Sequence, residues 1–506
     1  MAAVWPWAKV CDGRVWALVV DAAISVKTNS TLQIKMFIAI PGECFGVCFV
    51  EDKIIADLVG KIWRRDGLVS FMLAFFRFVV RWSWRLLLVV VLFFNCRLYW
   101  PSPLAQNTNQ VPGALRQQLN ANAKVLTSGA PHRMQQIFPE GFYFCHVLHG
   151  LTWIEAAQRD TSLTEEAIEN AKLAYKNLDS QECRDTFPSD LPPDHGAFYS
   201  AWKVHLLAGI VMLQMQEGAS KEIALTEKET DLAELQRLCD DWQRLFQDVP
   251  SPFFESYHGG IWPCDTLPAI HAMKTCDRIT NQNKYQGTID QWLKDVKQAL
   301  DSETGLIPHL NLADGKQTGQ GRATSQMIIL RMMPDIDEAF ARQQYELFRE
   351  RFLTTFGGIP CLYEYADGQG SSVGDVDTGP LVFGRSFSAT VFMIGVGQLY
   401  DDQPVADAIA VAGEAVGLPW TWADEKRYVG GVLPIGDIMV AYSQNAKRWS
   451  DGQGHYPQER SSIARGWRWK VHWYSSPLLL LAVGLWWRRR KRDRPKTRLY
   501  PKDENV

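Results

Sequence analysis

Apolar residues recur three and four positions apart through most of residues 112–447. This spacing places apolar side chains on one face of an α-helix, so it predicts helices. Twelve are expected, at 112–128, 134–157, 161–178, 196–216, 225–247, 263–280, 284–301, 321–334, 336–355, 385–400, 403–416 and 431–447. The alternation with period two that marks a strand is nearly absent. The sequence therefore predicts an all-α fold with little sheet.

The connections between these helices alternate between long and short from the third helix onward. The long ones are 179–195, 248–262, 302–320, 356–384 and 417–430, and they are rich in proline, glycine, aromatic residues and carboxylates. Long ordered loops in a compact domain are usually functional. Six helical hairpins with their long loops at one end predict an (α/α)6 toroid over residues 105–450, with the loops around its mouth. An open helical solenoid is the alternative fold.

Two apolar segments flank this domain. Residues 82–100, WSWRLLLVVVLFFNCRLYW, approach the roughly 20 residues that a transmembrane helix needs, and their aromatic ends suit the membrane interface. Residues 471–487 are shorter, and the basic run RRRKR follows them at once. We expect both segments to be transmembrane helices. The alternative for the second is a helix lying in the interface.

Basic residues predict the orientation of these two anchors. Arg64, Arg65, Arg77 and Arg81 precede the first anchor, and the pentabasic run follows the second. The positive-inside rule then places both termini in the cytoplasm and the domain between the anchors outside it. In a bacterium this means the inner membrane and the periplasm. Residues 1–71 show no clear period and are expected to be a poorly defined cytoplasmic segment or an over-extended start, and residues 488–506 a basic cytoplasmic tail.

The composition is that of an ordinary folded protein, with 46% hydrophobic residues, 22% charged residues and a net charge of −3. Such a balance argues against nucleic acid as a partner. The ten cysteines lack zinc-type spacing, and we expect neither a metal nor a cofactor. The six cysteines between the anchors permit disulfides in an oxidising compartment without demonstrating any. The twenty tryptophans suit membrane interfaces and clefts that bind carbohydrate or apolar ligands.

Polar residues that suit acid/base chemistry gather just before, or early in, the helices that follow the long loops. The candidates for catalysis are Glu255, Asp265, Asp375, Asp377 and, two turns into its helix, His205. The candidates for substrate binding are Asp194, His195, Tyr199, Tyr257, His258, Trp262, Arg322 and Glu364. If the long loops share one mouth, these groups converge there around an oxygen-rich substrate.

The motif GDVDTGP contains two of the candidate carboxylates. Asp375 and Asp377 are separated by one residue, and glycines and a proline hold them on an irregular turn. Like charges placed this close raise one pKa and divide the pair into an acid and a base. A hydrated turn or a calcium-like oxygen cluster is the alternative interpretation. For Asp265, at the start of a helix, the alternative is a helix cap.

The segment from His195 to about Asp402 resembles the linalool dehydratase/isomerase family, which folds as a six-hairpin α/α barrel. WKVHLLAGIVML resembles a family helix that carries a catalytic histidine, which implies that role for His205. GGIWPCDTLPAIHAM lies where the family has a Cys-Glu-Pro-Asp-Asn segment, and the family's cysteine and glutamate fall on Trp262 and Pro263. Asp265 and His205 keep their chemistry. The WP-x-D and D-x-D-[ST]-G-P patterns resemble those of membrane-anchored bacterial members.

These observations favour an extracytoplasmic enzyme, a lyase, isomerase or hydrolase that uses carboxylates and histidine. The number of carboxylates and aromatic residues favours a glycan or glycoside substrate. The family resemblance and the two anchors favour a terpenoid or lipid-like alcohol. A non-catalytic envelope protein that binds glycan, or serves as a scaffold, is the alternative from another class.

Overall fold

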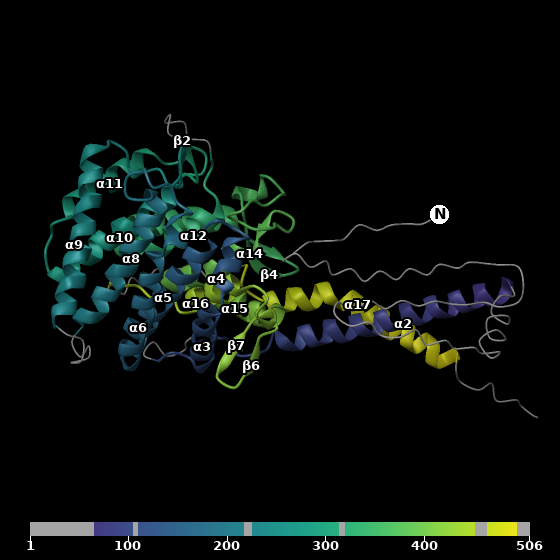
Figure 1. Ribbon diagram of the computed structural model, residues 1–506. Coiled ribbons are helices and arrows are strands. Elements are labelled where there is room, and N and C mark those ends of the chain that lie inside the picture. Colours follow the sequence, from purple (N-terminus) through teal and green to yellow (C-terminus); the bar gives the residue numbers. More distant parts are fainter. Residues whose placement is uncertain (1–64, 105–109, 217–224, 313–318, 451–462, 493–506) are drawn as a thin grey trace, which may run out of the picture. The chain divides into compact units, whose positions relative to one another are not determined.

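The computed structural model describes residues 65–104, 110–216, 225–312, 319–450 and 463–492 (Figure 1). The chain divides into two compact units, Met1–Leu87 and Leu88–Val506. Of the first unit the structure describes only the first part of helix α2 (Arg65–Arg97). Most of the predicted segment 1–71 and most of the predicted tail 488–506 therefore lie outside the described residues.

The second unit is mostly helical, as predicted. Its helices after α2 are α3 (Gly113–Thr127), α4 (Ala130–Gln135), α5 (Gly141–Arg159), α6 (Thr164–Leu178), α7 (Gln181–Arg184), α8 (Gly196–Met215), α9 (Leu225–Asp248), α10 (Pro263–Thr280), α11 (Gln286–Gln298), α12 (Ala323–Ile336), α13 (Glu338–Phe352), α14 (Phe387–Leu399), α15 (Gln403–Val416), α16 (Pro434–Gln444) and α17 (Trp467–Arg492). Short 3-10 turns add η1 (Thr161–Leu163), η2 (Ala366–Gly368) and η3 (Val429–Gly431). The helix predicted at 263–280 has the observed bounds, and most others agree to within a few residues.

The prediction at 134–157 was wrong in one respect, because the chain breaks between α4 and α5. Gly141 begins α5 where the backbone folds back on α4, and a Cβ there would lie 2.3 Å from the carbonyl carbon of Met134. Pro139 lies in the break, and the residue before a proline is disfavoured in the helical region. The apolar period continues through both helices, so it hides the interruption.

The few strands are short and lie in the long connections. β1 (Gly260–Ile261) pairs antiparallel with β2 (Asn311–Leu312). β3 (Leu353–Phe356), β4 (Ile359–Tyr363) and β5 (Arg385–Ser386) form a second sheet in that order, and β6 (Trp420–Trp422) pairs with β7 (Glu425–Arg427). None is longer than five residues. A period-two pattern cannot be read from so few positions, which is why the sequence did not reveal them.

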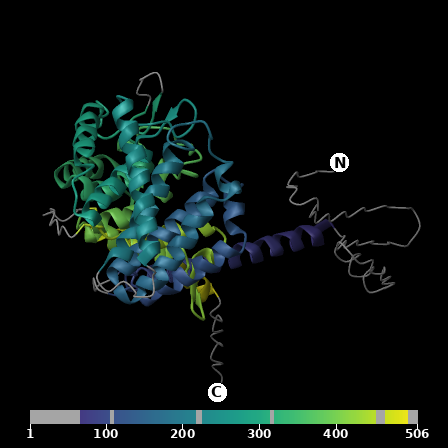
Figure 2. The same ribbon diagram turned by 60° about the vertical axis from the view of Figure 1, so that its left-hand side comes forward.

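Six helices contact one another in sequence order: α5 with α8, then α10, α12, α14 and α16, and α16 in turn contacts α5. The remaining long helices before α17 contact members of this series: α6 contacts α5 and α8, α9 contacts α8 and α10, α11 contacts α10, α13 contacts α12, α15 contacts α14, and α3 contacts α16 and α5. Figure 2 shows the helices between α2 and α17 packed together in one body. The helices of the first set carry most of the core, and α8 and α10 bury almost every residue.

The segments that precede these core helices are hydrogen-bonded to one another. The amide of Ala197 in α8 donates to the carbonyl of Glu255 (2.8 Å), and that of Ala323 in α12 donates to the carbonyl of Glu364 (2.9 Å). β1 and β2 join the segment before α10 to the one before α12, and the hydroxyl of Tyr257 donates to Glu140, just before α5. The amino-terminal ends of α5, α8, α10, α12 and, through β4 and β5, α14 therefore lie together.

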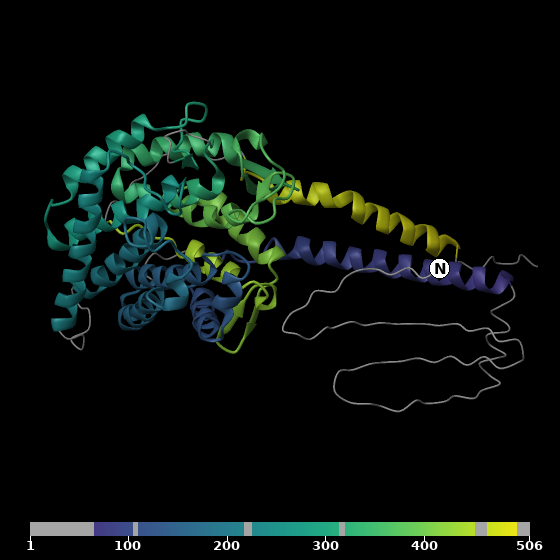
Figure 3. The ribbon, with the colours of Figure 1, turned by 45° about the horizontal axis from the view of Figure 1, so that its top comes forward.

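Among the described helices, two are long and apolar enough to cross a membrane. One is Ser70–Arg97 within α2, whose apolar stretch is not buried at all. The other is α8, whose apolar stretch is 89% buried. α8 is a core helix, so α2 is the exposed candidate. α17, which contains the predicted span 471–487 and is yellow in Figure 3, does not reach the same length of apolar sequence.

Candidate functional site

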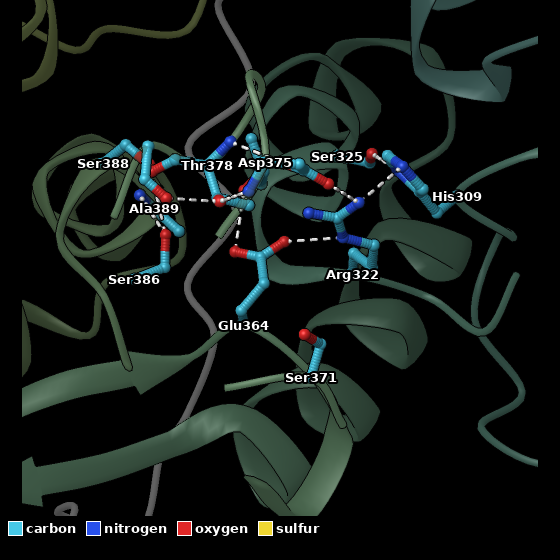
Figure 4. A network of polar contacts seen from close by, with 12 residues as sticks. His309, Arg322, Ser325, Glu364, Ser371, Asp375, Thr378, Ser386, Ser388 and Ala389 are labelled. Carbon is cyan, nitrogen blue, oxygen red and sulfur yellow. Dashed lines mark hydrogen bonds and ion pairs between the residues drawn. The ribbon is translucent and has the colours of Figure 1, made fainter. Parts of the chain in front are cut away.

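Arg322 lies at the centre of a polar network at the start of α12 (Figure 4). Its Nη1 donates to Asp375 (2.7 Å) and its Nε to Glu364 (3.0 Å). Arg322 and Glu364 are buried, whereas the side chain of Asp375 is 45% exposed. The Nη2 atom of Arg322 is buried without a protein partner among the described residues. It is a charged donor that a bound oxygen atom can engage.

His309 completes this network in its neutral form. Arg322 is always a donor, so the 3.0 Å contact from its Nη1 makes His309 Nε2 the acceptor. The other nitrogen, Nδ1, then carries the proton and donates to Ser325 (2.5 Å). Burial, with the nearby charge of Arg322, lowers the pKa of His309 to about 3. This histidine therefore orients Arg322 and does not itself carry charge at neutral pH.

The GDVDTGP turn has the geometry of a tight, glycine-dependent loop. A Cβ on Gly374 would lie 1.8 Å from the carbonyl oxygen of Gly379, so no larger residue fits there. The amide of Thr378 donates to Asp375 Oδ1, and the amide of Asp375 donates to Thr378 Oγ1, both at 3.1 Å. The hydroxyl of Ser388 in α14 donates to the Thr378 carbonyl (3.0 Å) and ties the turn to the helical core. These contacts hold the backbone that carries the Asp375 and Asp377 side chains in one conformation.

Asp375 and Asp377 differ in their affinity for protons. Burial alone would raise the pKa of Asp375, but the hydrogen bond and charge of Arg322 outweigh it and lower this pKa to about 2. Asp377 is an exposed residue. Even so, loss of water around its carboxylate, followed by the charge of Asp375, raises its pKa to about 6. The two members of the pair therefore differ in proton affinity: Asp375 is a fixed anion, and Asp377 can exchange a proton near neutral pH.

Asp265, near the start of α10, is a third carboxyl group in the same electrostatic environment. Its Oδ2 accepts from the hydroxyl of Ser256 (2.5 Å) and its Oδ1 from the thiol of Cys264 (3.5 Å), so side chains engage both oxygens. Burial raises its pKa to about 7, and the charges of Asp377 and Glu140 add to this rise. Asp265 therefore holds a proton at a pH at which Asp375 has lost its own.

Glu140 is a member of this acidic group that the sequence analysis missed. It precedes α5, it accepts a hydrogen bond from Tyr257, and its charge acts on both Asp265 and Asp377. The signal was the same one that identified the others, a carboxylate immediately before a core helix. It was lost because the helix predicted at 134–157 continued through residue 140.

The remaining candidates from the second long loop have separate partners. Tyr257 and Trp262 pack edge to face with ring centres 6.0 Å apart, and Trp262 is the residue from which α10 starts. Glu255 instead holds its own loop, since its Oε1 accepts from the amide of Gly259 (2.9 Å). His258 is exposed and contacts Asp190 (3.1 Å).

The candidates from the first long loop lie around the start of α8. Tyr199 directs its hydroxyl to the carbonyl of Leu178 (3.0 Å) at the end of α6, an outer helix. His195 lies beside it, with ring centres 5.1 Å apart, and Asp194 is exposed. The structure thus places Tyr199 in the packing between helices.

His205 belongs to a second buried cluster. It stacks on Trp449 (ring centres 4.4 Å apart) and lies edge to face with His271 (4.8 Å). His271 contacts Asp335 (3.1 Å), which also accepts from the amides of Trp449 and Ser450. Burial lowers the pKa of His205 well below its ordinary value. His205 lies nine residues after the start of α8, which is roughly 14 Å along a helix axis. It is therefore neutral and deep in the helical wall.

No group of three or more histidine, cysteine, aspartate or glutamate residues that could hold a metal ion occurs in the described part of the chain. The seven described cysteines are free thiols. Two surface cavities of about 450 and 460 Å³ lie away from the carboxylates, one lined by residues of α15 and α17 and the other by residues of α11 and Asp337.

Asp265 and Asp377 are thus groups that can hold or release a proton near neutral pH, and Arg322 is a cationic donor beside Asp375. Comparisons of the chain with protein-family models and with curated proteins found no match.

Proposed function

We propose that this chain is a membrane-anchored acid/base enzyme whose active site lies at the mouth of an (α/α)6 toroid. The unequal proton affinity of neighbouring carboxyl groups carries this proposal. Asp265 and Asp377 titrate near neutral pH, while Arg322 keeps Asp375 ionised. A turn or cap needs no such division, whereas acid/base catalysis does.

The order of helix contacts supports the toroid. The series from α5 to α16 returns to α5, and each of its members carries at least one outer helix. An open solenoid would leave its first and last helices without a mutual contact. The alternation of long and short connections favours the same architecture, because it brings every long loop to one end.

The roles follow from the pKa order. Asp265 is the general acid, since it is buried and holds its proton at the highest pH of the three. Asp377 is the general base and retains access to solvent, from which a water molecule or substrate hydroxyl can reach it. Arg322 and Asp375 form a fixed ion pair that positions the substrate oxygen. The reaction class is that of a lyase, isomerase or hydrolase, and an oxygen-rich glycan or glycoside is the leading substrate.

A terpenoid or lipid-like alcohol is the second candidate substrate. The resemblance to the linalool dehydratase/isomerase family favours it, as does the exposed apolar helix within α2. In that family's chemistry, protonation of a hydroxyl group would fall to Asp265. A scaffold that captures envelope glycan without converting it is the non-catalytic alternative.

The activity test compares purified full-length protein with Asp377→Asn and Asp265→Asn variants. Each is incubated with cell-envelope glycans, with glycosides and with terpenoid alcohols, and products are detected by mass spectrometry. We expect turnover of one class by the unaltered chain and loss of turnover in both variants, with unchanged melting temperatures. Glycan binding with no product from any class would support the scaffold alternative.

The matched control is Asp367→Asn. Asp367 lies in the same connection as Asp377 but pairs with Arg351 at the surface. It adopts a positive φ of 55°, which asparagine tolerates well. This variant should retain activity. If it lost activity to the same degree as Asp377→Asn, the effect would be one of loop structure and the catalytic assignment would fail.

The proposed topology has both termini in the cytoplasm, α2 and α17 in the inner membrane, and the helical domain in the periplasm. A reporter enzyme that is active only in the periplasm should work when fused after residue 460 and be silent when fused after Val506. Activity at both positions would mean that α17 lies in the interface.

A further inference from the structure

The connections before α14 and α16 each expose large apolar side chains. Phe383 is 78% exposed and Trp422 is 74% exposed, and Val373, Val376 and Trp420 are exposed as well. Together with Phe356, whose ring stacks on that of Phe383 with centres 6.0 Å apart, we call these residues the apolar rim. Exposed apolar side chains of this size and number are typical of a surface that contacts a membrane or another protein.

The apolar rim is continuous with the proposed site. Val373 lies just before the GDVDTGP turn and Val376 lies within it, and both are within two residues of Asp375 in the chain. Phe383 precedes Gly384, whose carbonyl accepts from the amide of Glu364 (3.0 Å). Glu364 in turn pairs with Arg322. Apolar residues of the rim are therefore adjacent along the chain to Asp375 and to the strand that follows Glu364.

The apolar rim also begins where the end of α2 meets the domain. Arg97, the last residue of α2, donates to the carbonyl of Glu414 (2.7 Å), and α15 ends two residues later. Leu98 packs with Ala412 and Ala415 of α15 in a small apolar cluster. The chain then leads directly into β6, which carries Trp420 and Trp422.

A second attachment leads to the other half of the apolar rim. The backbone of α17 crosses the turn between β3 and β4 so closely that a Cβ on Gly358 would lie 2.8 Å from the amide nitrogen of Val471. Phe356 ends β3 and directly precedes this turn. The guanidinium group of Arg385 lies over the Phe356 ring (5.7 Å). Paired cationic and aromatic side chains suit the headgroup layer of a bilayer.

We propose that the apolar rim lies in the interface of the bilayer that α2 crosses, and that the site takes its substrate from that bilayer. This inference rests on the proposed function and narrows the substrate to an amphipathic molecule. Its oxygen-bearing head reaches Asp265 and Asp377, while its apolar tail stays among the lipids beside the rim. The end of α2 adjoins one half of the apolar rim and α17 adjoins the other. A rim that a protein partner covers would not need to lie beside these two helices.

The test uses the full-length chain in vesicles of phosphatidylethanolamine and phosphatidylglycerol. A fluorescent amino acid replaces Phe383 in one variant and Trp422 in a second, so that a folding failure of either leaves the other informative. Leu173, exposed on the outer helix α6, is the control position. Lipids with a nitroxide near the headgroup should quench both rim probes and leave the control probe bright.

Two results would overturn the proposal. Rim probes with solvent-like, unquenched emission would show that the rim is free in water. Blue-shifted but unquenched emission would show that a second copy of the chain, or another protein, covers it.

A photoreactive amino acid at the position of Val373 tests delivery from the bilayer. Irradiation should attach lipid to this residue beside Asp375, as a mass increase on the peptide that contains it. Adducts with protein alone would contradict delivery from the bilayer. The quenching is repeated with Asp377→Asn, which removes a catalytic charge and leaves the rim intact. Quenching should persist there, so a failure of the acid/base proposal remains separate from a failure of membrane seating.

Discussion

Replacing Arg322 with glutamine tests whether this residue holds the site together electrostatically. Arg322 is 9% exposed and its partner Glu364 is fully buried, so the substitution leaves a carboxylate without its counter-charge in the protein interior. Breaking a buried ion pair in this way costs about 3–5 kcal/mol. Asp375 adds less than about 1 kcal/mol, because its exposed side chain is screened by water.

The pH dependence of this loss gives a sharper test. The folded-state pKa of Asp375 is depressed, so its stabilisation is present above its ordinary value of 3.8 and is lost as pH falls towards about 2. Burial raises the pKa of Glu364, so its ionised form opposes folding, and without Arg322 that opposition grows. The Glu364 effect makes Arg322→Gln most harmful at neutral pH and less harmful towards about pH 4, whereas the Asp375 effect is lost only below 3.8.

Chemical denaturation of the unaltered chain and of Arg322→Gln between neutral pH and about pH 4, where ordinary carboxyl groups begin to protonate, measures this difference directly. Arg351→Gln is the control, since Arg351 also pairs with an aspartate, Asp367, but at the surface. It should cost no more than about 1 kcal/mol. A loss for Arg322→Gln that stays constant with pH, or that matches the control, would refute the electrostatic role.

Other outcomes follow from the same geometry. The pH–rate profile should be bell-shaped with its maximum between about 6 and 7, because Asp377 must be ionised and Asp265 protonated, and a flat profile across that range would exclude these roles. Gly141→Ala should lower stability by about 1–3 kcal/mol through its clash with Met134, whereas Gly113→Ala, which meets nothing within 4 Å, should be neutral or stabilising in thermal melts. Asp335→Asn should destabilise the fold at neutral pH, because it removes the charge that His271 and two backbone amides stabilise, and calorimetry showing no loss would contradict that role.

The helices could be predicted because their signal is local and repeated. The period of apolar residues in α8, α10 and α15 fixes both the existence and the bounds of these helices. The break before Gly141 and the two- to five-residue strands escaped prediction, because each depends on a contact with a distant segment.

The candidate site was predictable in part for the same reason. Asp265 and Arg322 stood out by residue type and by position at helix starts, and Asp377 by its place in the GDVDTGP motif. The sequence could not show that Arg322 would choose Asp375 over Asp377 as its partner, and this choice decides which carboxylate titrates. Nor could it show that the hydroxyl of Tyr199 would donate to the carbonyl of Leu178 at the end of α6.

Buried contacts near His205 hold the core helices together, although the proposed site is carried by loops. Arg331 of α12 pairs with Glu155 of α5 (2.6 Å) and donates to the carbonyl of Tyr442 in α16 (3.0 Å), while His205 packs against His271 of α10. These buried contacts join α12 to α5 and α16, and α8 to α10. Breaking one of these buried contacts is costly, so the helical core resists distortion. The loops that carry the proposed site are then held by their own hydrogen bonds. On this reasoning the residues of the mouth can be exchanged without loss of the fold, as common scaffolds allow.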